Sequence, residues 1–131
     1  MIDVKNKIVA CDFDGTVVTH EYPNMGKDVP GAVSVLKELV EKGARLILYT
    51  MRSDDKLQDA VNWFKEREIP LWGINENPEQ KSWTNSPKIY AHDDIDDAAL
   101  GVPLFPGLRT ERPYVDWNEV SMMIFGAPPR E

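Results

Sequence analysis

Two carboxylates, Asp12 and Asp14, come at the end of a short apolar run, and a Gly-Thr pair follows them. A carboxylate can attack phosphorus and form an aspartyl-phosphate, and a second carboxyl group can protonate the leaving oxygen and then activate water. A hard cation such as Mg²⁺ would offset the repulsion between these carboxylates and a phosphate. Gly15 permits a tight turn, and exposed amides at Gly15 and Thr16 can contact phosphate oxygens. A surface turn is the alternative, but the apolar run favours a Mg²⁺-dependent phosphoryl-transfer site.

Short apolar runs predict the strands that must position these residues. The first run, residues 7–13, is typical of a buried parallel strand whose carboxyl end opens on a site. Residues 45–50 predict a second strand and residues 71–74 a short third strand. A fourth strand is expected within residues 89–95.

Helical periodicity and helix-stop signals separate these strands. One helix is expected to start at Pro30 and to stop at Gly43. Ser53 can cap a second helix. Asp116 and Glu119 form a capping box for a last helix that runs through residue 123.

This alternation of strand and helix predicts an α/β fold, a doubly wound (Rossmann-like) parallel sheet flanked by helices, in one domain over residues 1–131. In such sheets the ligand binds beyond the carboxyl ends of the strands. Asp12, Thr50 and the aspartates after Ile89 should therefore meet at one edge.

The segment Asp12-Phe13-Asp14-Gly15-Thr16-Val17-Val18 resembles the first motif of the haloacid dehalogenase (HAD) superfamily of phosphohydrolases. The resemblance spans roughly residues 7–101. It implies that Asp12 is the nucleophile, that Asp14 is the general acid/base, and that Asp12 and the main-chain carbonyl of Asp14 bind Mg²⁺. The short connections between the elements resemble those of members without a large cap domain.

The same resemblance assigns roles to residues of the second and third motifs. Thr50 would donate a hydrogen bond to the transferring phosphoryl group. Arg52 could bind the substrate's phosphate or another anionic group, or it could be a solvated residue at a helix start. The third motif requires a lysine, for which Lys88 is favoured over Lys81 because Lys88 directly precedes the fourth strand.

An acidic pair completes the family's metal shell, and this sequence offers two such pairs. The apolar pattern alone would end the strand early and favour Asp93 and Asp94. The segment 95–101 instead matches the Ile-Asp-Asp pattern of small family members, which makes Asp96 the metal ligand and Asp97 its supporting neighbour. Asp93 and Asp94 would then occupy strand positions, where at least one must face solvent or a partner.

Composition limits the partners and the location. The formal net charge of −7 argues against a general affinity for nucleic acids. No apolar run approaches the roughly 20 residues that cross a bilayer, no signal peptide is evident, and Cys11 is the only cysteine. We expect a cytoplasmic protein that acts on a phosphorylated small molecule or macromolecule, away from membranes.

Three alternatives to a phosphohydrolase share this fold. A phosphotransferase or mutase would use the same residues. A phospho-acceptor switch domain would need an acid after the third strand, where the chain instead has Gly73, Ile74 and Asn75. A non-catalytic scaffold is disfavoured by the intact Asp12 and Asp14. His20, in the excursion after the first motif, could contact substrate, but a solvent-facing role is the more common one for a loop histidine.

Overall fold

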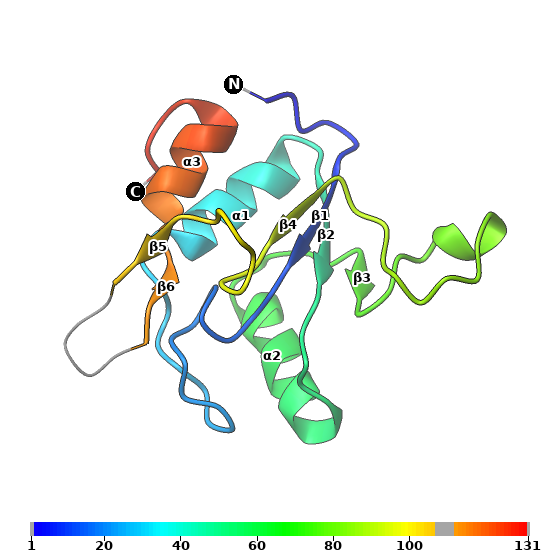
Figure 1. The fold of residues 1–131 in the computed structure, drawn as a ribbon, viewed down its shortest axis with the longest axis horizontal. Coiled ribbons are helices and arrows are strands. Elements are labelled where there is room, and N and C mark those ends of the chain that lie inside the picture. Colours follow the sequence, from blue (N-terminus) through cyan, green and yellow to red (C-terminus); the bar gives the residue numbers. More distant parts are fainter. Residues whose placement is uncertain (1, 107–111, 131) are drawn as a thin grey trace.

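A four-stranded parallel sheet forms the centre of the fold in the computed structural model, which describes residues 2–106 and 112–130. Its strands are β1 (Ile8–Cys11), β2 (Arg45–Leu48), β3 (Gly73–Ile74) and β4 (Asp93–Ile95). They lie in the order β3-β2-β1-β4 with every pair parallel (Figure 1). The predicted α/β architecture with a parallel sheet is confirmed, and the strands are shorter than the apolar runs that predicted them.

Three helices accompany the sheet: α1 (Ala32–Glu41), α2 (Asp54–Glu66) and α3 (Trp117–Phe125). Their buried side chains share one hydrophobic cluster with Val9 and Cys11 of β1. Because alternate residues of a strand point to opposite faces, the three helices pack on the same face of the sheet. This cluster is the main core of the protein.

The opposite face of the sheet is covered mainly by a loop. Ile8 and Ala10 of β1 face this side and pack with Trp72, Ile89 and Ala91. The segment that connects β3 to β4 contains a single short 3₁₀ helix, η1 (Gln80–Ser82), instead of an α-helix. The connections between strands therefore cover both faces of the sheet, as in a doubly wound fold. The connection from β3 to β4 covers its face without an α-helix.

The helix ends differ in detail from the predicted ones. Helix α1 begins two residues after Pro30, because Gly31 adopts a left-handed conformation with φ of 86° and serves as the N-cap. Ser53 is the N-cap of α2, but its hydroxyl makes no capping hydrogen bond. The predicted role of Asp116 is confirmed, since its carboxylate accepts hydrogen bonds from the amides of Asn118 and Glu119.

A small antiparallel pair, β5 (Leu104–Phe105) and β6 (Tyr114–Val115), was not predicted from the sequence. It leads into α3 and joins the C-terminal region to the turn after β1. The amide of Val115 donates to the carbonyl of Gly15 at 3.1 Å. The indole Nε1 of Trp117 donates to the carbonyl of Thr16 at 2.7 Å. Within residues 2–106 and 112–130, no helix has the length and apolar character needed to span a membrane.

Candidate active site

The candidate site lies where the strand order of the sheet reverses direction. Starting from β1, the chain adds β2 and β3 on one side and β4 on the other. At such a switch point the loops after the two central strands diverge and leave a crevice. Asp12 directly follows β1 and Asp96 directly follows β4, so both occupy this crevice.

An open pocket of about 680 Å³ marks this position. Its lining combines acidic residues with aromatic, basic and sulfur-containing side chains. The lining residues are Asp12, Asp14, His20, Tyr22, Thr50, Met51, Arg52, Asp96, Asp97, Ala98 and Arg112.

Three carboxylates form the centre of the pocket. One oxygen from each of Asp12, Asp96 and Asp97 lies within 4.8 Å of the others. Thr16 joins two of them, because its Oγ1 donates to Asp12 Oδ2 at 3.0 Å and accepts from the amide of Asp97 at 3.1 Å. Three partly buried carboxylates at this spacing form the all-oxygen donor set that a hard divalent cation such as Mg²⁺ prefers, so the residues fit a metal ion.

Burial and the neighbouring carboxylates change the pKa of Asp12. Burial, then the nearby charge of Asp96 and a hydrogen bond with Asp97, raise the pKa of Asp12 to about 8. Burial also raises the pKa of Asp96. Both shifts show that the site, taken without a cation, holds more carboxylate charge than its surroundings stabilise.

We expect this charge to make the metal-free protein less stable as the pH rises. Asp12 binds its proton more tightly in the folded chain than in the unfolded chain, so its contribution to stability is complete below about pH 4 and is lost as the pH approaches 8. Urea unfolding in EDTA should show a free energy of unfolding that falls between pH 5 and pH 8 by on the order of 2 kcal/mol.

Asp12→Asn is the control for this pH dependence. It keeps the shape of the side chain and removes its titration, so the variant should lose most of the slope and should be more stable than the wild type at pH 8. An unchanged slope in Asp12→Asn would show that another group is responsible.

Asp14 does not join the carboxylate cluster. Its side chain pairs with Arg52, whose Nε donates to Oδ2 at 2.8 Å and whose Nη2 donates to Oδ1 at 2.7 Å. The predicted metal contact of Asp14 was its main-chain carbonyl, and this carbonyl accepts no hydrogen bond from the described residues. The carbonyl is therefore available as an oxygen ligand, while the carboxylate is bound by Arg52.

The amides of Gly15 and Thr16, which were predicted to contact phosphate oxygens, already have acceptors within the chain. The amide of Gly15 donates to the carbonyl of Val18 at 2.7 Å, and that of Thr16 donates to the carbonyl of Phe13 at 3.1 Å. Both amides serve the tight turn, for which Gly15 has a φ of 81°. A Cβ at Gly15 would overlap the carboxylate of Asp97 and the ring of His20, so this glycine provides space beside the site.

The structure brings Thr50 to the pocket, whose described lining includes neither of the candidate lysines. Thr50 lines the pocket, and its amide donates to Asn75 Oδ1 at 2.8 Å. Among the described residues that line the pocket, neither Lys88 nor Lys81 is present. Partial desolvation raises the pKa of Asp94 in β4, and the positive charge of Lys88 acts against this rise. Lys81 lines a separate pocket beside the β3–β4 connection.

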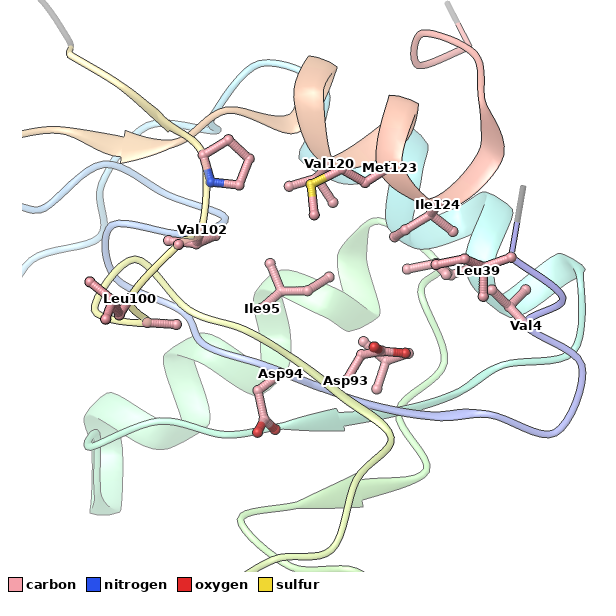
Figure 2. A pocket seen from close by; sticks show the side chains of 15 residues that line it. Val4, Leu39, Asp93, Asp94, Ile95, Leu100, Val102, Val120, Met123 and Ile124 are labelled. Carbon is pink, nitrogen blue, oxygen red and sulfur yellow. The ribbon is translucent and has the colours of Figure 1, made fainter.

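The two acidic pairs have different surroundings. Asp93 and Asp94 belong to β4 itself, and they are exposed there because β4 is an edge strand. Figure 2 shows them beside a second, mostly apolar pocket of about 260 Å³, which they share with side chains such as Val120 and Ile124. Asp96, beyond the end of β4, lies with Asp12 instead.

Several residues at the site were given no firm role from the sequence. His20 is mostly buried, and its Nε2 lies 3.3 Å from Asp97 Oδ2. Tyr22, Met51 and Arg112 line the same pocket. The excursion after the first motif has no regular pattern that would orient His20 or Tyr22, and no sequence signal connects Arg112 to residues a hundred positions earlier.

The fold and the site together define a parallel α/β protein with a carboxylate centre at the switch point of its sheet. The solved structure of a conserved protein from Bacteroides thetaiotaomicron is similar, with 33% identity over 91% of this chain and 90% of that chain and a TM-score of 0.74. The chain therefore belongs to the same family as that conserved protein. No protein-family model matches the chain, and no curated protein matches it.

Proposed function

We propose that the protein is a Mg²⁺-dependent phosphohydrolase of the HAD superfamily, of the small type without a large cap domain. It would hydrolyse a phosphate monoester through an aspartyl-phosphate formed on Asp12. The observation that carries the proposal is the meeting of three carboxylates from β1 and β4 beside Asp14 and Thr50. A surface turn at Asp12–Thr16 would not gather aspartates from a strand more than 80 residues away in the chain.

The metal ligands would be the carboxylates of Asp12 and Asp96 and the main-chain carbonyl of Asp14, with Asp97 as a further carboxylate beside them. Bound Mg²⁺ would offset the charge of these groups and of the phosphate. This role agrees with the raised pKa of Asp12, since a cation and a proton relieve the same excess of negative charge.

The remaining residues would bind, orient and transfer protons. Asp12 Oδ would attack phosphorus while Asp14 gives a proton to the leaving oxygen, and Asp14 would then take a proton from the water that hydrolyses the acyl phosphate. The hydroxyl of Thr50 would donate to a phosphoryl oxygen. The amide of Asp14, which has no acceptor within the described parts of the chain, can donate to another phosphoryl oxygen. Thr16 would hold Asp12 at a fixed angle.

The pocket is open, and its walls include the exposed side chains of Tyr22 and Met51. An open site suits either a phosphorylated macromolecule or a small ester, and we propose a phosphorylated substrate of one of these kinds, without general nucleic-acid binding. The cytoplasm is the proposed location, in keeping with the single, buried thiol of Cys11.

Turnover of a fluorogenic aryl phosphate tests this proposal. We expect activity in Mg²⁺ that falls to background in excess EDTA and returns when Mg²⁺ is restored, because the acidic centre cannot accept a phosphate dianion without a cation. Phosphate release that is insensitive to EDTA would contradict the proposal. Stable phosphorylation of Asp12 without release would instead indicate a phospho-acceptor domain.

A further inference from the structure

Arg52 is more deeply buried than any other charged side chain at the candidate site. It has 2% of its surface exposed, although it lines the pocket and lies two residues before the start of α2. A buried guanidinium is costly unless each of its N–H groups finds an acceptor. Its hydrogen bonds therefore show what the side chain does in the fold.

Four N–H groups of Arg52 are already bonded within the protein. Two hold the carboxylate of Asp14 in a bidentate pair, a third donates to the carbonyl of Asn24 at 3.0 Å, and a fourth donates to the carbonyl of Lys56 at 3.4 Å. An arginine has five such groups. Little capacity is left for a substrate phosphate, which favours a role of Arg52 within the fold over the alternative that it binds the phosphate.

The surroundings of Arg52 fix its orientation as well as its bonds. The guanidinium carbon lies 5.0 Å from the ring centre of Phe13 and 5.3 Å from that of Tyr22. The main chain is also held, because the amide of Arg52 donates to Thr50 Oγ1 at 3.1 Å. A rigid, planar donor fork in a fixed place allows one orientation of the carboxylate it binds.

We infer that Arg52 is a positioning residue that holds the carboxylate of Asp14 beside the reacting phosphate. This inference rests on the proposed function, in which Asp14 is the general acid/base. Arg52 acts through Asp14 and does not contact the substrate. Its contribution should appear in kcat and not in substrate binding, since the orientation of a proton-transfer group affects the reaction step.

A double-mutant cycle tests the inference, with a fluorogenic aryl phosphate in Mg²⁺. Arg52→Lys keeps the charge but removes the planar fork, and should lower kcat by about 10- to 100-fold with KM and the inhibition constant of inorganic phosphate within about 3-fold. In an Asp14→Asn background the same substitution should lower kcat by less than about 2-fold, because its target is already lost. Arg52→Gln, which keeps one amide donor, provides a second variant if Arg52→Lys does not fold.

The chain offers a matched control. Arg67 makes the same kind of bidentate pair with Asp28, at 2.9 Å for both bonds, and lies over the ring of Trp63. Arg67→Lys should leave kcat and KM within about 2-fold, because this pair does not line the pocket.

The other outcomes separate this inference from the proposed function. If Arg52→Lys keeps the wild-type kcat but shows a large rise in KM and in the phosphate inhibition constant, Arg52 is a phosphate ligand. This result would overturn the inference and leave the proposed function standing. If Arg52→Lys lowers kcat by the same factor in the Asp14→Asn background as in the wild type, Arg52 has a structural role that does not act through Asp14. This result would also overturn the inference. A wild-type protein without turnover would overturn the proposed function and the inference together.

Discussion

Asp12→Asn is expected to abolish phosphate release, with kcat at least about 10⁴-fold below the wild type. The amide nitrogen and oxygen of Asn are too weakly nucleophilic to replace a carboxylate in the proposed attack on phosphorus. The side chain keeps its size, so the hydrogen bond from Thr16 Oγ1 can still form to the amide oxygen. Steady-state turnover of an aryl phosphate in saturating Mg²⁺ measures the effect.

The stability of this variant makes its loss of activity interpretable. The raised pKa of Asp12 predicts that Asp12→Asn is at least as stable as the wild type at pH 8. A folded and inactive variant therefore indicates lost chemistry, whereas an active Asp12→Asn protein would rule out an aspartyl-phosphate on this residue.

The second large effect concerns the acidic pair that we propose as metal ligands. Asp96→Asn should weaken Mg²⁺ binding by about 100-fold, because it removes one charged ligand from a set of three carboxylates. Calorimetric titration of the metal-free protein with Mg²⁺ gives the dissociation constant without reference to turnover. Activity at limiting Mg²⁺ should fall in parallel.

Asp93→Asn is the matched control for this substitution. It makes the same change in net charge three residues earlier, at a side chain that lies beside the apolar pocket of Figure 2. Mg²⁺ affinity should stay within about 2-fold, since an exposed charge on the edge strand is screened by solvent. If Asp93→Asn loses Mg²⁺ binding and Asp96→Asn keeps it, the metal is held by Asp93 and Asp94.

The parts of the site that follow directly from a strand could be predicted from the sequence. Asp12 comes at the end of a buried apolar run, and a parallel strand delivers its next residue to the carboxyl edge of the sheet whatever the rest of the chain does. The position of Asp96 was harder to predict, because β4 is a strand of three residues of which two are charged. The apolar pattern alone ended it too early, and only the resemblance to small HAD proteins favoured the register that places Asp96 beside Asp12.

The parts that depend on side-chain direction or on loops could not be predicted. Arg52 follows Thr50 in sequence, but a five-bond side chain can turn toward substrate or inward, and the acceptors that decide this lie on separate segments. Lys88 precedes β4 as expected. The connection around it has no helical or strand periodicity, so nothing in the sequence indicated that Lys88 would be missing from the described residues that line the pocket.

The hydrogen bond from Trp117 to the carbonyl of Thr16 joins residues that are 101 positions apart. The chain is synthesised from its N-terminus, so Asp12–Thr16 leaves the ribosome long before the residue that completes its turn. The buried indole of Trp117 can reach Thr16 only after β6 has formed and α3 has begun. A nascent chain that stops before residue 114 therefore carries Asp12, Asp14, Asp96 and Asp97 but lacks the hydrogen bonds that Val115 and Trp117 donate to the turn after β1.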